Sequence, residues 1–420
     1  MALNEQQAAA VDAVMSWLTD KEADPFFLLG GSAGTGKTFT MQEIVRRVRG
    51  RVVFTAPTNK ATRVLRLTLT REDYRPECKT IYSLLGLTMA ANGEVKEIAT
   101  PEEPVDLSKY TLVVIDEISM AGEQLFDHIQ TAAENFGVRF LLLGDPAQLP
   151  PVGELESPAW TEVYDQALLT KVMRQDNQIL TLATMLREKV KAPMSALRLV
   201  NDHDDVEGVF VRGQAMELDL IRMAESGLLS KPDGGKVIAW RNVTVDRYNQ
   251  MARRAIFGNE AIMPWLAEDR VIFTGPARDL ENQPIAATDD EGTVLRASEG
   301  WHPIFAEFKI WSVTISLDEG GVVTARVLHP EHAVAFSAKK EALAAEARKN
   351  GRRWKAFWEF QEAFHGLRHA YAITAHRSQG STYHTALVDW RDILLNKNRA
   401  EAMRCLYVAA TRPKKVLIFN

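Results

Sequence analysis

Short apolar runs alternate with amphipathic stretches along the first part of the chain. The runs at residues 26–29, 52–55, 111–120 and 140–143 have the length and composition of buried strands. Residues 3–18, 37–50 and the stretch from Asn59 onward carry apolar residues at helical spacing, and Asn4 is a suitable N-cap for the first helix. This order of elements is typical of a parallel sheet covered by helices.

A second set of apolar runs predicts a second α/β half. Its strands are expected at residues 236–240, 371–375, 385–390 and 415–419, with helices between them. Residues 256–365 interrupt this half with several short strands and turn signals, in the segments RVIFTG, GTVLRAS, FKIWSVTISL and GGVVTARVL. We therefore expect a small antiparallel barrel within the second half, followed by helices.

The helical end of that insert admits two interpretations. Aromatic residues gather near one helix face, beside basic residues, at Trp354, Phe357, Trp358 and Phe364. They either pack the helix onto the barrel, with the charges facing water, or stack against a polyanion. A separate signal lies at residues 87–108, where alternating segments flank Asn92-Gly93 and predict a β-hairpin with a type I′ turn.

Composition narrows the class of protein. The 420 residues, 46% hydrophobic and 25% charged, suit a globular chain of about three structural units. The net charge of −5 provides no general basic field, so a polyanion must be held by local patches. Cys78 and Cys405 lack metal-ligand spacing and are expected to be buried thiols in a reducing compartment. With no leader pattern and no apolar run of about 20 residues, we expect a cytoplasmic protein without membrane contact.

The segment GSAGTGKT follows the first predicted strand and opens a helix, which is the context of a P-loop. Gly31, Gly34 and Gly36 allow the backbone N–H groups to surround phosphate oxygens at a helix N-terminus. Lys37 would reach the β- and γ-phosphates, and Thr38 would ligate Mg²⁺. The chain is therefore expected to bind ATP and Mg²⁺.

Carboxylates and amides follow later strands. Asp116 and Glu117 end the third strand, where the first carboxylate suits Mg²⁺ and the second suits activation of water. This pair favours hydrolysis over phosphoryl transfer to a metabolite. Asp145 and Gln148 follow the fourth strand, where an amide can sense the γ-phosphate, and Arg412 suits an arginine finger.

Several other residues keep two interpretations open. Gln6 or Gln7 either reads an adenine edge or is solvated, and Thr58 and Asn59 either grip a sugar-phosphate backbone or form a capped turn. Arg174 is either a surface residue or functional. Taken alone, His376 would more often be structural than catalytic.

Eight segments occur in the order of superfamily 1 helicase motifs: GSAGTGKT, TAPTNKAT, TIYSLLG, VVIDEIS, GDPAQLPPVG, TKVMRQ, AITAHRSQGST and LYVAATR. The chain thereby resembles the superfamily 1B DNA helicases of the RecD/Dda family, most closely the phage Dda-type helicases. Two departures stand out. Tyr82 occupies a position where relatives often have histidine, and the hairpin turn at residues 91–94 has no aromatic tip.

The resemblance implies an α/β fold with two tandem RecA-like P-loop domains, an inserted β-hairpin and an inserted SH3-like β-barrel domain. It implies these boundaries: 1–86 and 110–180 for RecA-like domain 1A, 87–109 for hairpin 1B (the pin), 181–255 and 366–420 for RecA-like domain 2A, and 256–365 for SH3-like domain 2B with its helical extension.

Carried over position by position, the resemblance also implies site residues. Catalytic roles fall to Lys37, Glu117, Gln148, Arg174 and Arg412; nucleotide contacts to Gln7, Gly31, Ser32, Ala33, Gly34, Thr35, Gly36, Lys37, Thr38 and Gly380; metal ligation to Thr38 and Asp116; and DNA contacts to Pro57, Thr58, Asn59, Thr80, Met89, His376, Ser381 and Thr382.

The expected activity is that of an ATP-dependent DNA helicase that moves 5′ to 3′ on single-stranded DNA and unwinds duplexes, as a monomer. Expected partners are single-stranded and forked duplex DNA, with a single-stranded-DNA-binding protein or replication and recombination factors as further candidates. For a phage protein the location would be the host cytoplasm. The alternatives are a translocase or RNA-directed ATPase that does not separate strands, and a nucleic-acid-binding module with an inactive ATP site.

Overall fold

The computed structural model describes residues 3–70, 74–89, 95–97, 105–151, 153–171, 178–204 and 206–420. The chain forms two compact units. The first comprises Met1–Val211, Ser378–Thr382 and Trp390–Phe419, and the second comprises Arg212–Arg377, Tyr383–Asp389 and Asn420. Both units contain segments that are distant in sequence, and the domain boundaries expected from the sequence stay a prediction.

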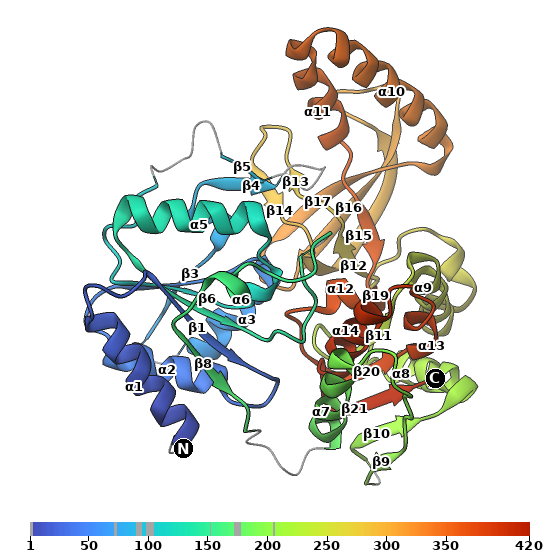
Figure 1. Ribbon diagram of the computed structural model, residues 1–420. Helices are drawn as coiled ribbons and strands as arrows, with labels where there is room; N and C mark the ends of the chain where they lie inside the picture. Colours follow the sequence, from blue (N-terminus) through green and yellow to red (C-terminus); the bar gives the residue numbers. More distant parts are fainter. Residues whose placement is uncertain are drawn as a thin grey trace. The chain divides into compact units, whose positions relative to one another are not determined.

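The first unit contains a six-stranded parallel sheet with strand order β3-β2-β6-β7-β1-β8 (Figure 1). Its strands are β1 (Phe26–Gly31), β2 (Val52–Ala56), β3 (Glu77–Thr80), β6 (Leu112–Ile115), β7 (Arg139–Gly144) and β8 (Gln166–Leu169). The four strands expected from the apolar runs are confirmed as β1, β2, β6 and β7. The two edge strands, β3 and β8, were not predicted because their residues are largely polar or partly exposed.

Helices cover both faces of this sheet (Figure 1). Alternate strand residues such as Phe27 and Leu29 pack with α1 (Glu5–Thr19), α2 (Lys37–Arg47) and α3 (Asn59–Leu69). Phe26 and Leu28 face the other way, towards α4 (Ile81–Leu84) and α5 (Glu123–Phe136). The remaining elements are the 3-10 turn η1 (Ile118–Met120), α6 (Ala159–Glu162), α7 (Gln178–Lys191) and α14 (Arg399–Ala410). Helix α2 ends three residues before the Gly50 expected from sequence, because Val48 adopts extended backbone.

A second six-stranded sheet has the order β19-β11-β20-β21-β10-β9. Its strands are β9 (Asp202–His203), β10 (Gly208–Val211), β11 (Gly235–Ala239), β19 (Ala372–Thr374), β20 (Tyr383–Val388) and β21 (Pro413–Phe419). Its associated elements are η2 (Gly213–Ala215), α8 (Met216–Glu225), α9 (Asn242–Phe257), η3 (Gly258–Ile262), α12 (Ala375–Ser378) and α13 (Trp390–Ile393). The parallel pairs β10–β21, β11–β19 and β11–β20 confirm a second parallel α/β half.

The segment between β11 and β19 carries a five-stranded antiparallel sheet of order β17-β16-β15-β12-β18, and a separate β13–β14 pair. The strands are β12 (Arg270–Phe273), β13 (Ala277–Arg278), β14 (Pro284–Ala286), β15 (Glu291–Trp301), β16 (Lys309–Leu317), β17 (Val322–Leu328) and β18 (Leu367–His369). The four strands expected there are confirmed. Their apolar sides form one core that includes Trp311, Val313 and Ile315.

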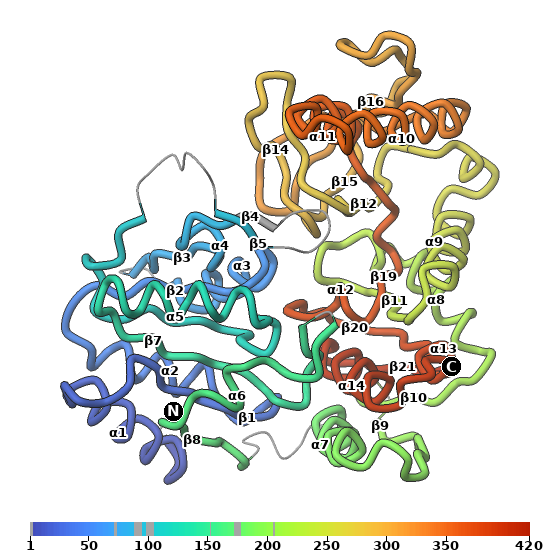
Figure 2. Tube along the Cα trace, turned by 45° about the horizontal axis from the view of Figure 1, so that its top comes forward, coloured from blue at the N-terminus to red at the C-terminus, as the bar shows by residue number. Residues whose placement is uncertain are grey.

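The helices of this insert are α10 (Ala333–Lys349) and α11 (Trp354–Glu362), with turns η4 (Pro330–His332) and η5 (Gly351–Arg353), and the two helices lie side by side (Figure 2). Phe336 of α10 stacks on Phe360 of α11 at 4.9 Å, and both contact Phe308 and Phe364. The packing interpretation is therefore confirmed for Phe364. Trp354, Phe357 and Trp358 contact one another, and Trp354 is exposed, so for these residues the choice between packing and stacking stays a prediction.

The short strands β4 (Leu87–Met89) and β5 (Val95–Glu97) pair antiparallel, as expected for the two arms of a hairpin. The Asn92-Gly93 turn and its tip lie outside the described residues. Cys78 and Cys405 are both buried and free. Among the residues that the structure describes, no helix is long and apolar enough to span a bilayer.

Candidate nucleotide-binding site

The loop between β1 and α2 has, at two positions, a left-handed backbone geometry that glycine adopts most readily. Gly34 and Gly36 have φ values of 80° and 83°, in the left-handed region. A Cβ on Gly31 would lie 2.7 Å from Thr35 Oγ1 and 2.9 Å from the Leu169 carbonyl oxygen. The loop therefore curves tightly at the end of a buried strand and leads directly into a helix N-terminus, which is the arrangement that binds phosphate.

The side chain of Lys37 closes back over this loop. Its Nζ donates to the carbonyl oxygens of Gly31, at 2.6 Å, and Ser32, at 3.3 Å. Thr38 follows it, partly exposed, in the first turn of α2. The loop glycines and the lysine fit a nucleotide phosphate, and the Thr38 hydroxyl and the Asp116 carboxylate are hard oxygen donors of the kind that Mg²⁺ prefers.

Gln7 is buried against the P-loop, at 2% exposure, which excludes the solvated interpretation. Its Nε2 donates to the Thr35 carbonyl at 3.0 Å, and its Oε1 accepts from the Asn4 N–H at 3.1 Å within a capping box. Gln6 instead bonds the Thr170 hydroxyl at 3.0 Å. The structure thus selects Gln7, rather than Gln6, as the glutamine beside the loop.

Asp116 and Glu117 follow the last residue of β6. The Asp116 N–H donates to the Thr55 carbonyl at 2.8 Å, and the Glu117 N–H donates to Asp116 Oδ1 at 2.9 Å. Glu117 has φ of 55°, a left-handed conformation that costs a non-glycine residue about 1 kcal/mol. The strand end therefore imposes a specific orientation on this carboxylate.

The charges around the pair lie close enough to act on it. Burial, and then the neighbouring Asp116 carboxylate, raise the pKa of Glu117 to about 7, whereas Arg412 and Lys37 oppose the rise. Burial likewise raises the pKa of Asp116, opposed by the Glu117 N–H and by Lys37. Two carboxylates and two cations from three separate segments thus share one electrostatic environment.

Asp145, which follows β7, is fully buried and makes several polar contacts through its carboxylate. Its Oδ1 accepts from the Ala147 N–H at 3.0 Å and lies 3.7 Å from Arg187 Nε, and its Oδ2 accepts from the Tyr407 hydroxyl at 2.5 Å. The same hydroxyl accepts from the Ala33 N–H of the P-loop at 3.3 Å. Burial raises the pKa of Tyr407, so it remains a protonated donor to Asp145. Tyr407 of α14 thereby links the P-loop to Asp145.

Gln148 is buried close to α14. Its Oε1 accepts from Gln379 Nε2 at 3.0 Å, and its carbonyl oxygen accepts from Arg404 Nη1 at 2.7 Å. Sequence reasoning missed Arg187, Gln379, Arg404 and Tyr407. The motif segments AITAHRSQGST and LYVAATR contained the signal for Gln379 and Tyr407.

Arg412 is 7% exposed and fixed by three bonds. Its Nε donates to the Val408 carbonyl at 2.9 Å, its Nη1 to the Ser381 carbonyl at 3.2 Å and its Nη2 to Thr411 Oγ1 at 2.8 Å. This guanidinium is held at the end of α14 and acts on Glu117 through its charge. Arg174, the other expected arginine finger, lies outside the described residues.

The expected DNA contacts near β2 form a local group. Pro57 and Thr58 are partly exposed and Asn59 is exposed. Thr58 Oγ1 accepts from the Ala61 N–H at 3.1 Å, so the capped-turn interpretation holds for this side chain. Gly380, with φ of 73°, lies against the same helix end, because a Cβ there would be 3.2 Å from Ala61 Cβ. The loop at residues 378–382 therefore packs beside the start of α3.

The other expected DNA contacts differ in accessibility. Thr80 caps α4 through the Ser83 N–H, and His376 is exposed. Ser381 is buried at 2% exposure, while Thr382 is partly exposed. Met89 is the last residue of β4.

Comparison with known proteins shows which families and relatives this chain resembles. The protein-family model for the AAA domain matches residues 2–209, and the family model for the UvrD-like helicase C-terminal domain matches residues 369–419. Uncharacterized protein R530 of Acanthamoeba polyphaga mimivirus is 24% identical, over 99% of both chains. ATP-dependent DNA helicase dda of Enterobacteria phage T4 is also 24% identical, over 98% of this chain and 97% of the relative.

The fold is similar to that of Pif1 helicase from Bacteroides in complex with ADP-AlF3 and single-stranded DNA, with a TM-score of 0.52 and 17% identity over 100% of this chain and 92% of the other. Fold and site together define a P-loop ATPase with paired parallel α/β halves. The family models and the curated relatives make the chain similar to ATP-dependent DNA helicases, of which dda is matched over nearly its whole length.

Proposed function

We propose that the protein is an ATP-dependent DNA helicase that translocates on single-stranded DNA and unwinds duplex DNA. The observation that carries the proposal is the shared electrostatic environment of Lys37, Asp116, Glu117 and Arg412 beside the P-loop. A binding module has no need of a water-activating carboxylate held in a strained conformation beside two cations. The full-length similarity to the phage T4 helicase supports DNA as the substrate.

The site residues divide the work of hydrolysis. ATP supplies the phosphoanhydride bond whose cleavage drives movement. The P-loop N–H groups and Lys37 bind its phosphates, and Thr38 and Asp116 would hold Mg²⁺. Glu117 orients and deprotonates the attacking water, while Gln148 senses the γ-phosphate. Arg412, with Arg174, stabilises charge that develops during transfer.

DNA binding belongs to the same proposal. We assign strand contacts to Pro57, Thr58, Asn59, Thr80 and Met89, and to the group His376, Ser381 and Thr382. The β4–β5 pair would act as the separation pin, and the five-stranded sheet with β13–β14 as an SH3-like domain, within the domain boundaries given above. The protein would work as a monomer, with single-stranded-DNA-binding or replication and recombination proteins as further partners.

A translocase that does not separate strands is the second candidate. It is favoured by the hairpin sequence, because Ala91, Asn92, Gly93 and Glu94 include no aromatic side chain to stack on a base pair.

Paired assays test the proposal. ATP hydrolysis is measured with and without single-stranded DNA, and strand separation is measured on forked duplexes with defined tails. We expect DNA-stimulated hydrolysis and ATP-dependent unwinding, both lost in Glu117→Gln. Stimulated hydrolysis without unwinding would select the translocase, and hydrolysis that responds only to RNA would refute DNA as the substrate.

A further inference from the structure

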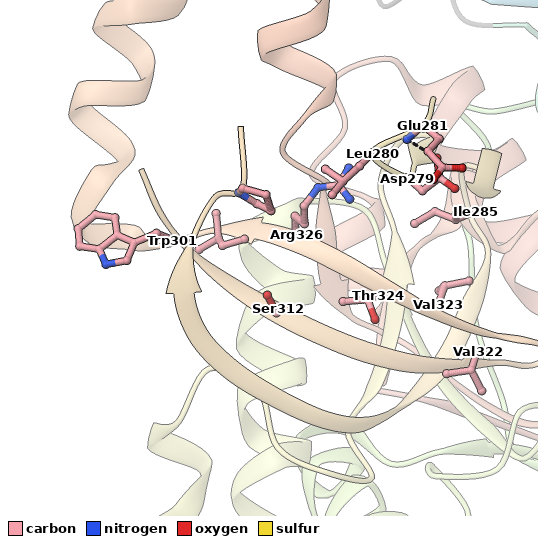
Figure 3. A pocket seen from close by; sticks show the side chains of 12 residues that line it. Asp279, Leu280, Glu281, Ile285, Trp301, Ser312, Val322, Val323, Thr324 and Arg326 are labelled. Atoms are coloured by element: carbon pink, nitrogen blue, oxygen red, sulfur yellow. Dashed lines mark hydrogen bonds between the residues drawn. The ribbon is translucent and has the colours of Figure 1, made fainter. Parts of the chain in front are cut away.

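The inserted sheet carries a pocket of about 510 Å³ that takes no part in the nucleotide site (Figure 3). Leu280 and Ile285, from the β13–β14 segment, line one side, and residues 322–324 of β17 line the other. Ile310 of β16 also lines it, and Trp301, 60% exposed, lies at the end far from Leu280. The pocket is thus an elongated groove, partly apolar and partly charged, beside an edge strand.

The backbone of β17 is open on the side away from β16. β17 is the outermost strand of its sheet. At its two ends, the Gly321 carbonyl and the His329 N–H form backbone hydrogen bonds to β16, so the odd-numbered residues face that strand. Even-numbered residues therefore direct their N–H and C=O groups outward. The outward N–H of Arg326 donates to His365 Nδ1 at 3.1 Å, and its carbonyl oxygen accepts from the His365 N–H at 2.8 Å. Thr324 lies two residues earlier. Among the described residues, its outward N–H and C=O have no hydrogen-bond partner, so another strand could pair there.

The guanidinium of Arg326 lines the groove and retains a free donor. The residue is 9% exposed. Its Nε and Nη2 donate to the carbonyls of Ala363 and Arg278 at 3.3 and 2.7 Å, and Nη2 lies 3.1 Å from His365 Nε2. Within the described part of the chain, Nη1 has no hydrogen-bond partner and no carboxylate lies within 4.0 Å of the group. A charged donor that is accessible from the groove suits a carbonyl oxygen supplied by a ligand.

Acidic residues at the end of the groove select against a polyanion. Asp279 accepts from the backbone N–H groups of Glu281 and Gln283 at 2.9 and 2.8 Å, which fixes its carboxylate in the β13–β14 turn. Glu281 is exposed beside it, and both line the groove (Figure 3). Phosphodiesters would be repelled there, whereas a lysine or arginine side chain would be attracted.

We propose that this groove binds an extended peptide segment of a partner protein, added as a strand along the outer edge of β17. Its backbone would pair with Thr324, and a carbonyl oxygen would accept from Arg326 Nη1. An apolar side chain would cover Ile310 and Trp301, and a basic side chain would face Glu281. This combination of backbone pairing and side-chain pockets is how edge strands recognise peptides. None of the groove residues belongs to the nucleotide site, and peptide binding there would not depend on helicase activity.

The test is selection from a phage-displayed library of random peptides against the full-length protein. Enriched peptides are synthesised with a fluorophore and titrated by fluorescence anisotropy. We expect sequences in which a lysine or arginine lies between apolar residues. Trp301→Ala and Glu281→Lys should each weaken binding about tenfold or more, since groove aromatics and charge pairs dominate such interfaces. Thr324→Pro, which removes the outward N–H, should abolish it.

Matched controls separate the groove from general surface effects. Trp354→Ala replaces an exposed tryptophan on α11, and Glu341→Lys an exposed glutamate on α10, both outside the groove. Neither should alter the affinity. DNA-stimulated ATP hydrolysis and thermal melting confirm that every variant is folded. The proposal would be overturned if library phage were enriched no better than phage that display no peptide. It would also be overturned if Trp301→Ala and Glu281→Lys left the affinity unchanged, or if a dT oligonucleotide displaced the peptide.

Discussion

The Lys37 side chain bonds its own loop through Gly31 and Ser32, where a bound phosphate would sit. Lys37→Ala should therefore abolish ATP hydrolysis while single-stranded DNA binding stays within about twofold, because the strand contacts involve other residues. Hydrolysis and DNA affinity measured on the same folded preparation check this. Equal loss of both would show that the phosphate and DNA sites are not separate.

Glu117 differs from Lys37 because its contribution is chemical. Glu117→Gln keeps the shape and the strained backbone but removes the base, so turnover should fall by about 10² or more with nucleotide still bound. Steady-state hydrolysis and binding of a fluorescent ATP analogue separate these effects. Glu123→Gln, at an exposed position in the first turn of α5, is the control and should hydrolyse ATP normally.

Among the elements, β11 is tied to the inserted sheet by a buried ionic network. Lys236 of β11 donates to Glu291 at 2.8 Å and to the Ala370 carbonyl, and Arg270 of β12 contacts Glu291 at 3.4 Å and Asp318 at 2.6 Å. Lys236 and Arg270 are 2% and 1% exposed. Because the charges satisfy one another, removing one leaves an uncompensated buried charge.

Lys236→Met should lower the local unfolding free energy by about 3 kcal/mol, at the low end for a broken buried pair because Arg270 still contacts Glu291. Hydrogen exchange of the β12 and β15 amides measures this. The exposed pair Lys415–Glu207, at 2.7 Å, provides the control, and Lys415→Met should cost less than about 1 kcal/mol. A similar small effect at both lysines would mean that the network contributes little to stability.

The junction between β17 and the segment before β18 should be sensitive to acid. Burial, and then the charge of Arg326, lower the pKa of His365 from 6.5 to about 4, against the bond to the Arg278 carbonyl. Between these values the unfolded chain binds the extra proton, so stability is complete above about pH 6.5 and decreases as pH falls towards 4. The loss is on the order of 3 kcal/mol. Thermal melting of the wild type and of His365→Gln between pH 6.5 and 4 tests this prediction. If the stability of both proteins fell equally with pH, His365 would not be the cause.

Elements whose stability is local were predictable from the sequence. Buried strands such as β1 and β6, the P-loop glycines and the Asn4 cap each have a signature within a few residues. Contacts between distant residues were not. The burial of Gln7 depends on Thr35, 28 positions away, and the Tyr407–Asp145 bond joins residues 262 positions apart. Edge strands such as β3 lacked a signal because water, rather than a core, surrounds much of their side-chain surface.

For the whole molecule, the open question is the direction of movement. ATP binding sets how far a motor of two α/β halves closes, but polarity depends on which half holds the strand more tightly in each nucleotide state. The residues of the site do not determine that difference. The resemblance of the sequence motifs to superfamily 1B helicases does carry an expectation, which is movement from 5′ to 3′.

We therefore expect a duplex with a 5′ single-stranded tail to be unwound, with ATP and Mg²⁺ required, and a duplex with a 3′ tail to remain intact. On a 5′ tail the motor loads and moves towards the junction, whereas on a 3′ tail the same movement takes it off the free end. Anisotropy first establishes equal loading on the two substrates, and Lys37→Ala controls for passive melting. Faster unwinding from the 3′ tail at equal loading would contradict the predicted polarity and leave the ATPase assignment unaffected.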